Sequence, residues 1–538
     1  MPGFVNEYTY RNYMESGKEG EFDKAFDDAV DMVGRELFGK EHPLHIGDNN
    51  VMTQEKLIEY SPIDGTLLGN FQKAGRNEAR QAIDAAADAF ASWSAMDYRD
   101  RAAIFQKAAD LFSRSKFELA AILSMENGKT RYESIGEVDE AIDFMRYYAT
   151  EVMSSRNFAR KAVIRASAAK VAEGFQGAPG REEKVSILMK PYGVFGIIGP
   201  FNFPLSISVG MSTGALITGN TVVFKPSTDN MTMLTGMRIY ELFREAGIPA
   251  GVFNYVSGPG SEVGDEIVIS PKVEGIAFTG SRKTGLAMMK RTIDAGLQKT
   301  YIVEMSGKNP VIVSKISDID AAAEGVAAAS FGYSGQKCSS CSRVYVHESV
   351  KDQFVGKLLE RTRTLRIGNP LMKESYIGPI ISKAALDRYT AAVKEAGSSG
   401  KIIFGGKVVD TGLKGIYVEP VVALLDHGNR LFHDELFLPF VVIDTYKEFD
   451  EALSKANDSE FGLTAGLYSN KSREIRDFLD GIRSGVVYVN RETSATTGAI
   501  VGMHSFVGWK GSGLTGKGTG SRLYLHQFMH EQSQSIVR

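Results

Sequence analysis

The sequence predicts an α/β fold with two parallel β-sheets. Short apolar runs rich in β-branched and aromatic residues, such as "YGVFGIIGP" and "NTVVFKPS", alternate with helical stretches such as "MTMLTGMRIYELFREAG". Short strands separated by helices form βαβ units, whose parallel strands are buried on both faces. The alternation resumes at "TYIVEMSGKNPVIVS" and continues to "LPFVVIDTY". This predicts a second α/β layer system, distinct from the first.

The chain before the first strands is predicted to be helical from residue 77 to about residue 148. In "NEARQAIDAAADAFASW", the residues Ile83, Ala87, Phe90 and Ala91 recur on one helical face. Asn77 is the predicted N-cap of this helix.

A charged stretch with Gly and Pro follows these helices at residues 169–191, "AKVAEGFQGAPGREEKVSILMKP". Gly and Pro residues between regular segments are typical of a stretch that leaves the domain, and we expect a hairpin used in assembly. The C-terminal residues 532–538, "QSQSIVR", are the second candidate for a contact between subunits.

Composition excludes several classes of protein. The 62 basic and 65 acidic residues nearly balance, so nucleic acid is not an expected partner. No run of about 18 apolar residues is present to cross a membrane, and the first residues lack the apolar core of a secretory signal. Two cysteines in 538 residues cannot form a disulfide framework, so we expect a reducing, cytoplasmic setting.

The only two cysteines, Cys338 and Cys341, lie three apart in "SGQKCSSCSR". One such pair with eight scattered histidines does not supply the four ligands of a zinc site, and no metal is expected. A redox pair would normally open the helix of a small βαβ domain, and two buried inert thiols are a further alternative. Cys338 follows a polar turn with glycine, which favours an accessible thiolate nucleophile.

Two glycine-containing turns are candidate phosphate sites. "GPGSEVG" contains Gly258 and Gly264 after an apolar strand, although its third glycine comes one residue later than in the dinucleotide fingerprint. "FTGS" places Phe278, Gly280 and Ser281 at a strand-to-helix turn, where backbone N–H groups can hold a phosphate.

A third glycine motif points to a rival function. "GSGLTGKG" is close to a nucleotide-binding P-loop, with Gly511, Gly516 and Lys517 at the required spacing. Gly518 stands where Ser or Thr would hold magnesium, and no clean apolar strand precedes the motif. Nucleoside triphosphate hydrolysis is therefore the weakest alternative.

Seven segments together resemble the aldehyde dehydrogenase superfamily, in the family's order and over nearly the whole chain. They are "GPFNFPL", "FKPS", "GPGSEVG", "FTGS", "VEMSGKNP", "GQKC" and "DELFLP". The resemblance implies a Rossmann-like cofactor domain, an α/β catalytic domain and a small β extension for oligomerisation. The expected bounds are 1–166 with 191–302 for the cofactor domain, 303–524 for the catalytic domain, and 167–190 with 525–538 for the extension.

The resemblance also implies the chemistry. An aldehyde cannot release hydride from its planar form, so a nucleophile must first add to its carbonyl carbon. By the family pattern Cys338 attacks, the side chain of Asn202 and the N–H of Cys338 hold the oxyanion, and Glu304 activates water to hydrolyse the thioester. A relative that transfers the acyl group to coenzyme A is less expected, because Glu304 is present.

The resemblance implies NAD as the cofactor. Lys225 would bind the adenosine ribose, and Glu435, with Phe437 beside it, the nicotinamide ribose. The other expected cofactor contacts are Ser227, Gly258, Gly264, Phe278, Gly280 and Ser281. NAD-preferring members often have a carboxylate where Ser227 and Thr228 stand here, and a neutral residue removes repulsion against a 2′-phosphate. We therefore expect NADP to be accepted as well.

A narrower resemblance concerns the substrate. The beginning "FVNE" and the ending from "VNRETSATTG" to "SRLYLHQF" resemble the branch that oxidises L-glutamate γ-semialdehyde, the open form of 1-pyrroline-5-carboxylate, in proline degradation. By this resemblance Gly520, Ser521 and Ser339 anchor the α-carboxylate, since backbone N–H groups of a glycine loop suit an anion. Phe203 and Phe528 would sandwich the aliphatic chain, and Glu140 would meet the ammonium.

Other functions remain as alternatives. Within the class, the substrate is another semialdehyde with a carboxylate, such as succinate or 2-oxoglutarate semialdehyde. A catalytically silent binding protein on the same fold is a different class, although a silent protein has no need to keep Cys338, Glu304 and Asn202 together. As a partner we expect only a second copy of the chain, in a dimer or larger homo-oligomer, with no nucleic acid and no membrane.

Overall fold

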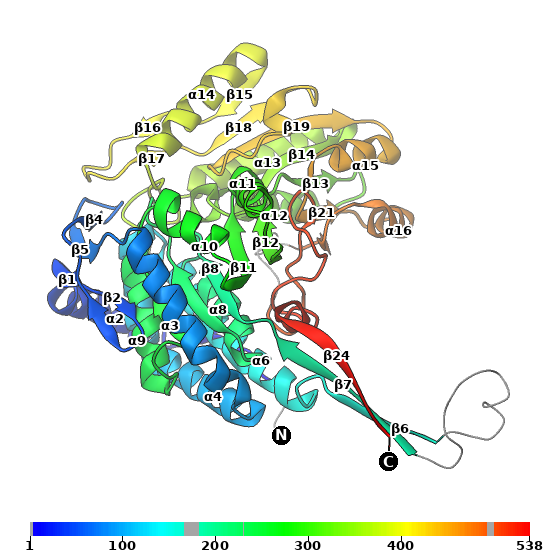
Figure 1. The fold of residues 1–538 in the computed structure, drawn as a ribbon. Coiled ribbons are helices and arrows are strands. Elements are labelled where there is room, and N and C mark those ends of the chain that lie inside the picture. Colours follow the sequence, from blue (N-terminus) through cyan, green and yellow to red (C-terminus); the bar gives the residue numbers. More distant parts are fainter. Residues whose placement is uncertain (1–3, 166–181, 230, 492–499, 538) are drawn as a thin grey trace.

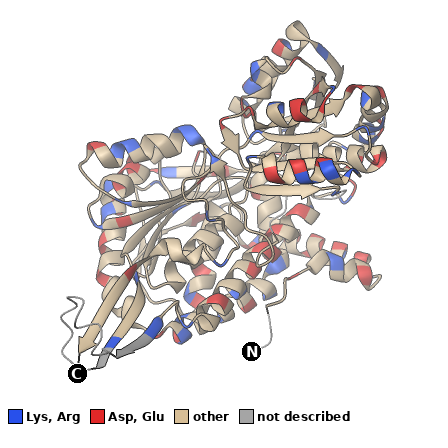
Figure 2. Ribbon diagram, turned by 90° about the vertical axis from the view of Figure 1, so that its right-hand side faces the viewer, with Lys and Arg blue, Asp and Glu red and all other residues tan. Residues whose placement is uncertain are grey.

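Two seven-stranded sheets and a projecting three-stranded sheet form the framework of the molecule (Figure 1). The computed structural model describes residues 4–165, 182–229, 231–491 and 500–537. Acidic and basic residues are interspersed along the outer helices, whereas the strands of the two large sheets carry few charges (Figure 2). Among the described helices, none combines the length and the apolar character that crossing a membrane would require.

The first sheet has the strand order β12-β11-β8-β9-β10-β2-β3. Its bounds are β2 (Leu44–Ile46), β3 (Asn49–Val51), β8 (Val194–Ile198), β9 (Thr221–Lys225), β10 (Phe253–Tyr255), β11 (Val273–Gly280) and β12 (Thr300–Met305). The strands from β12 to β10 are parallel, and β2 and β3 continue the sheet antiparallel. The chain runs outward from β8 through β9 to β10 and then returns to β11. Strands β8 and β11 therefore flank a topological switch point, where a crevice opens at the carboxyl ends of the strands.

Helices cover both faces of the first sheet, which explains why its strands read as continuous apolar runs. One face packs, directly or in a second layer, against α2 (Glu19–Glu36), α4 (Tyr98–Arg114), α5 (Lys116–Asn127), α6 (Arg131–Ser154), α8 (Ser206–Ile217) and α9 (Met233–Ala246). The other face packs against α3 (Arg76–Ala95), α10 (Asp265–Ile269) and α11 (Arg282–Asp294). Phe195 and Ile197 of β8 point to the first face and Val194 and Ile198 to the second.

The second sheet has the order β15-β18-β19-β14-β13-β21-β22, parallel except for the edge strand β15. Its bounds are β13 (Asn309–Val313), β14 (Cys341–His347), β15 (Lys401–Phe404), β18 (Val421–Leu424), β19 (Phe440–Tyr446), β21 (Thr464–Tyr468) and β22 (Val486–Val489). One face packs against α12 (Ile319–Phe331) and α13 (Lys351–Thr364). The other packs against α14 (Lys383–Ser399), α15 (Phe449–Asn457) and α16 (Ser472–Gly481).

Shorter elements complete the fold. They are α1 (Thr9–Glu15), β1 (Lys40–His42), β4 (Lys56–Tyr60), β5 (Leu67–Gln72), β16 (Val408–Val409), β17 (Tyr417–Val418), β20 (Phe461–Gly462) and β23 (Trp509–Lys510). Strands β1, β5 and β4 form a small sheet, and β16–β17 and β20–β23 form two-stranded pairs.

Strand β12 differs from the prediction. The pattern placed "TYIVEM" in the second α/β layer system, but Thr300–Met305 pairs in parallel with β11 of the first sheet. The chain crosses to the second sheet in the short segment between Met305 and Asn309. Strand pairing is a long-range property that local pattern does not contain. The consequence is that Glu304, near the end of β12, lies where the two sheets meet.

The buried face and the cap of α3 also differ from the prediction. The N-cap residue is Gly75 rather than Asn77, and the buried face consists of Ala79, Ala82, Ile83, Ala86 and Trp93. Of the predicted face only Ile83 is buried, and Ala91 is exposed. The segment is rich in alanine, so its hydrophobic contrast is too weak to distinguish one helical face from its neighbour.

The three-stranded sheet projects from the body of the molecule (Figure 1). It contains β6 (Arg160–Arg165), β7 (Glu182–Pro191) and β24 (Met529–Val537), all antiparallel. A hairpin was predicted at residues 169–191, of which residues 166–181 lie outside the described residues. The C-terminal strand β24 pairs with β7 along its whole length, and all of its residues after Met529 are exposed.

Candidate active site

A cavity of about 480 Å³ lies at the junction of the two large sheets and α6. Its wall includes Glu304 of β12, Cys338 and Ser339 before β14, and a C-terminal loop that runs from Phe506 to Thr519. Six of the residues that the family resemblance assigned to the site line it. They are Glu140, Phe203, Phe278, Glu304, Cys338 and Ser339.

A tight turn presents Cys338 to the cavity. Tyr333 and Ser334 have φ of 51° and 53°, and Gly335 has φ of 67°. A Cβ on Gly335 would stand 2.2 Å from the carbonyl oxygen of Leu438, so only glycine fits there. The amide of Asn309 donates to the carbonyl oxygen of Cys338 at 2.7 Å. The half-buried thiol is therefore held by a strained backbone between α12 and β14.

The surroundings of Cys338 favour the protonated form of its thiol. Burial is the largest cause that raises its pKa, and the carboxylates of Glu304 and Glu435 raise it further. The N–H groups of Cys338 and Ser339 act in the opposite direction. The sequence predicted an accessible thiolate, and the structure instead shows a partly buried thiol that must lose its proton to a base before it attacks.

Asn202 lies beside the turn that precedes Cys338. It follows β8 at the switch point of the first sheet, and its side chain is buried. Its Nδ2 donates to the carbonyl oxygen of Gln336 at 3.2 Å. An amide nitrogen carries two hydrogens, so the second N–H is still available to an oxygen atom near Cys338.

Glu304 enters the cavity wall from the end of β12. Its Oε1 accepts a hydrogen bond from the N–H of Gly508 at 2.9 Å, and its backbone forms a bridge with Gly513. Burial raises the pKa of the Glu304 carboxyl to about 8, against the effect of the Gly508 N–H. The C-terminal loop thus holds a carboxyl group that can take up or release a proton near neutral pH.

Lys225, Gly280 and Ser281 lie at the carboxyl ends of β9 and β11. Lys225 is buried, and its Nζ donates to the carbonyl oxygen of Pro226 at 3.2 Å. Burial lowers its pKa to about 8. Because an ammonium has three donors and one is used here, the geometry fits a hydroxyl group of a ligand. Ser281 caps α11, since its Oγ accepts a hydrogen bond from the N–H of Thr284 at 3.2 Å.

Glu435 faces the crossing between the two sheets. Its Oε1 accepts a hydrogen bond from the N–H of Gly307 at 2.8 Å, and burial raises its pKa. Phe437 has φ of 58°, and its ring lies edge-on to that of Phe201, with centroids 5.7 Å apart. The unused lone pairs of Glu435 fit the hydroxyl groups of a ribose.

The profile of the aldehyde dehydrogenase family matches residues 51–533. The chain belongs to this family. The chain is 36% identical to a 1-pyrroline-5-carboxylate dehydrogenase of Anoxybacillus flavithermus over 521 residues, which are 95% of this chain and 96% of the relative. It is 37% identical over the same shares to the enzyme of that name from Bacillus cytotoxicus.

Two solved structures show the same fold. A 1-pyrroline-5-carboxylate dehydrogenase from Thermus with bound NAD matches with a TM-score of 0.90 and 33% identity, over 100% of this chain and 99% of the other. An NADP-dependent enzyme from E. coli matches with a TM-score of 0.83 and 28% identity, over 93% and 99% of the two chains. The predicted fold class is confirmed.

Three residues expected from the family's substrate loop are placed differently. Phe528 is buried in the core, with its ring centroid 5.1 Å from that of Phe195, and Tyr524 lines the cavity instead. The N–H of Gly520 donates to the hydroxyl oxygen of Tyr148 at 3.0 Å. The hydroxyl of Ser521 donates to the carbonyl oxygen of Gly518 at 2.7 Å. The family pattern does not contain the direction of each side chain and N–H group.

Gly258 and Gly264 flank the short turn that leads into α10, and their assignment to the cofactor stays a prediction. A Cβ on Gly258 would stand 2.5 Å from the carbonyl oxygen of Ala74, so this glycine permits close packing of two loops. Gly264 ends η1 (Gly260–Gly264), a single π turn that leads into α10. Neither glycine lines the cavity.

Sequence reasoning missed most of an acidic wall on α6. Glu133, Asp139 and Asp143 line the cavity together with Glu140, and Glu7 joins them from the N-terminal segment. Residues 136, 139, 140 and 143 share one helical face, so the helical period could have revealed this wall. Two lysines, Lys337 and Lys517, also line the cavity.

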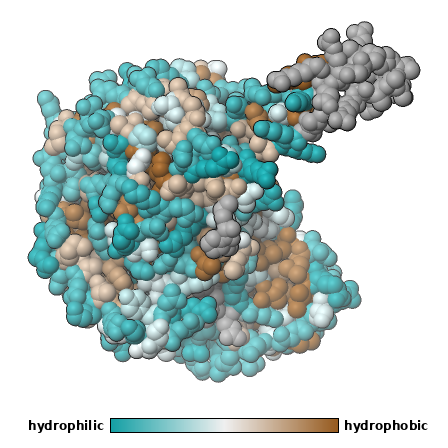
Figure 3. All heavy atoms as spheres, turned by 90° about the horizontal axis from the view of Figure 1, so that it is seen from below, coloured by the Kyte–Doolittle hydropathy of each residue, from teal (hydrophilic) through white to brown (hydrophobic). Residues whose placement is uncertain are grey.

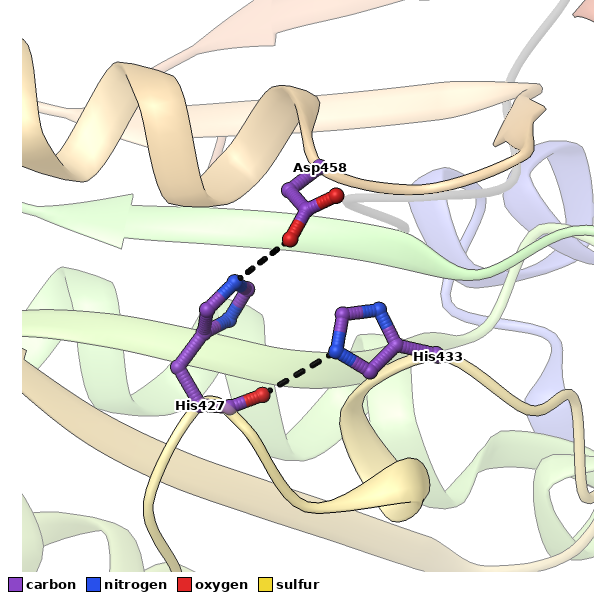
Figure 4. Close-up of side chains that lie close together, drawn as sticks. All are labelled: His427, His433 and Asp458. Carbon is purple, nitrogen blue, oxygen red and sulfur yellow. Dashed lines mark hydrogen bonds and ion pairs between the residues drawn. The ribbon is translucent and has the colours of Figure 1, made fainter.

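Within the described ranges, His427, His433 and Asp458 are the one group of three side chains with metal-ligand spacing (Figure 4). Nε2 of His427 lies 3.0 Å from Asp458 Oδ2, and its Nδ1 lies 3.0 Å from the hydroxyl of Tyr345. Nε2 of His433 lies 3.1 Å from the carbonyl oxygen of His427. These bonds make the group a polar network between the end of β18 and the end of α15.

Proposed function

We propose that this chain oxidises L-glutamate γ-semialdehyde to L-glutamate with NAD, in proline degradation. The observation that carries the proposal is one cavity that holds a thiol, a carboxyl of raised pKa, an acidic wall and two lysines. An amino-acid aldehyde presents an ammonium, a carboxylate and a carbonyl group, and each has a partner of suitable charge there. The relatives' name, 1-pyrroline-5-carboxylate dehydrogenase, supports the same substrate.

Cys338 is the proposed nucleophile. Its thiol loses a proton to a base, and the sulfur adds to the aldehyde carbon to give a tetrahedral thiohemiacetal. The free N–H of Asn202 and the N–H of Cys338 hold the oxygen as it becomes negative. Losing one such donor typically lowers the rate by about 10²–10³-fold.

Glu304 is the proposed base for the second half of the reaction. NAD, when bound, supplies the acceptor for the hydride that leaves the tetrahedral carbon, and Cys338 then carries a thioester. The Glu304 carboxylate takes a proton from water, which attacks the thioester carbonyl. The products are a carboxylic acid and the regenerated thiol of Cys338.

The proposed cofactor site lies at the carboxyl ends of the parallel strands of the first sheet. Lys225 donates to the adenosine ribose, and Glu435 accepts from the nicotinamide ribose with Phe437 beside it. Ser227, Phe278, Gly280 and Ser281 stay assigned to the same site as predictions. Ser227 and Thr228 carry no charge, so NADP is proposed as a second cofactor, although the carboxylate of Asp229 lies near enough to act on the Lys225 ammonium.

The α-substituents of the substrate are assigned to opposite charges. The acidic wall with Glu140 faces the ammonium. Lys517 and the loop N–H groups between Gly516 and Thr519, with Ser339, face the carboxylate. The aromatic contact to the aliphatic chain comes from Phe203, and Tyr524 replaces Phe528 in this assignment.

We expect purified protein to reduce NAD fastest with 1-pyrroline-5-carboxylate, which opens to the semialdehyde in water. Absorbance of reduced nicotinamide reports the rate, and each substrate is assayed with NAD and with NADP. Succinate semialdehyde and 2-oxoglutarate semialdehyde are the comparison substrates. Faster turnover of either one contradicts the substrate assignment, and no reduction of saturating NADP contradicts the second cofactor.

Assembly through the projecting sheet is proposed with a second copy of this chain as the partner. An exposed edge strand presents unpaired backbone N–H and C=O groups that can pair with another chain. In β24 the side chains of Ile536 and Val537 are also 52% and 55% exposed. Hydrophobic residues also appear near this extension on the surface in Figure 3. The projecting sheet is the proposed oligomerisation domain. The first large sheet is the centre of the proposed cofactor domain, and the second large sheet is the centre of the proposed catalytic domain.

Sedimentation of the purified protein should therefore give the mass of a dimer or larger homo-oligomer. The two free cysteines favour a reducing, cytoplasmic location, which is proposed for the protein. Replacing Ile536 and Val537 by glutamate should shift that mass toward the monomer. A monomeric wild type would contradict the assignment of the sheet to assembly.

A further inference from the structure

Residues 4–9, here called the N-terminal strap, form part of the cavity wall. Glu7 and Tyr8 line the cavity beside Tyr132 and Asp143 of α6. The strap enters α1 at Thr9. It is separated from the rest of the cavity wall by more than a hundred residues of sequence, and the nucleophile and the base come from the second half of the chain.

Two carboxylates of α6 hold the strap. Asp143 accepts hydrogen bonds from the Asn6 side chain and the Glu7 N–H, both at 2.8 Å. Asp139 accepts from the N–H and the hydroxyl of Thr9, both at 2.7 Å. Four donors of a six-residue segment therefore converge on two acidic residues of the cavity wall.

The strap also contacts residues 501 and 502, which precede the C-terminal loop. Asn6 Nδ2 donates to the carbonyl oxygen of Val501 at 3.0 Å, in addition to its bond with Asp143. The ring of Phe4 lies 5.3 Å from that of Tyr147, and a Cβ on Gly502 would stand 2.9 Å from the Phe4 ring. Val501 lines the cavity, so Asn6 bridges the two walls that face the substrate.

The donors of the strap affect the charge of the acidic wall. Burial raises the pKa of Asp139 to about 6 and that of Asp143 to about 7, while the bonds from Thr9, Asn6 and Glu7 oppose the rise. Glu7 repels both groups, and Lys116 favours the charged form of Asp139. A carboxylate that loses such donors in a buried site becomes neutral more readily. The wall would then attract an ammonium less.

We propose that the N-terminal strap determines substrate specificity, by keeping the acidic wall charged and by fixing the cavity wall at Val501. This inference rests on the proposed function, since it concerns recognition of the ammonium of an amino-acid aldehyde. Asn6 and Thr9 are positioning residues, because they act through Asp143, Asp139 and Val501.

The test compares Asn6→Ala and Thr9→Val with the wild-type protein and with Asn12→Ala, an exposed asparagine on α1. For glutamate semialdehyde we expect KM to rise about tenfold in Asn6→Ala, as for loss of a hydrogen bond to a charged group, and kcat to change little. For propionaldehyde, which has no ammonium, KM should change less than about twofold. Asn12→Ala should match the wild type.

The outcomes separate a specificity role from a structural one. Unchanged KM for glutamate semialdehyde in both strap variants contradicts the proposal. An equal loss with propionaldehyde, or a loss of kcat alone, also contradicts it, since general destabilisation affects both aldehydes. If the wild-type protein is inactive with glutamate semialdehyde, the proposed substrate is refuted. The KM values of the wild type and the strap variants are then compared with 4-aminobutanal, which has the ammonium but no carboxylate. An unchanged KM in both strap variants with that aldehyde contradicts the role of the strap.

Discussion

Replacing Cys338 by serine should lower the rate of aldehyde oxidation at least about 10³-fold, as expected for loss of a nucleophile. The cavity contains this thiol and Glu304, and the amide of Asn202 is bonded to Gln336, two residues before the thiol. A serine hydroxyl in the same place is a much weaker nucleophile. Reduction of NAD by pyrroline-5-carboxylate measures the effect. Binding of NAD, followed by calorimetry, should be retained, because Lys225 and Glu435, the residues proposed to hold its riboses, are unchanged.

Cys341→Ser is the matched control, since it changes the only other cysteine in the same way. Cys341 is buried at the start of β14 within a core of residues from α12 and α13. A hydroxyl there costs about 1–3 kcal/mol of stability, so we expect a lower Tm and most of the activity. Loss of activity in Cys341→Ser with retention in Cys338→Ser would show that the two thiols have been assigned the wrong way round.

Features that depend on local composition were predictable from sequence. The parallel sheets follow from apolar runs between helices, and the turn before Cys338 follows from Gly335 among polar residues. In each case the residues that decide the structure are neighbours in the chain.

Features that depend on long-range pairing were not predictable. The sheet to which β12 belongs is decided by β11, and no residue of β12 specifies that partner. Phe528 and Tyr524 are both aromatic and four residues apart, but only Tyr524 faces the cavity. By contrast, Asp139 and Asp143 could have been found, since their spacing of four places both on the helical face that carries Glu140.

Replacing Glu304 by glutamine should stop the reaction after the thioester has formed. The amide keeps the shape of the side chain and can still accept from the Gly508 N–H, but it cannot take a proton from water. We expect one rapid burst of reduced nicotinamide per active site, then a steady rate lowered by about 10²–10⁴-fold. Mass spectrometry of the intact protein should show the acyl group on Cys338.

The pH profile distinguishes a base from a residue that only shapes the cavity. The pKa of Glu304 is raised to about 8, so the carboxylate, which is the active form of a base, accumulates as the pH rises through that value. Thioester hydrolysis in the wild type should therefore rise about tenfold per pH unit below 8 and level off above it. Glu304→Gln should lose this slope, whereas Glu360→Gln, an exposed glutamate on α13, should keep it. A Glu304→Gln protein that turns over without a burst and with the wild-type slope would show that another group activates the water.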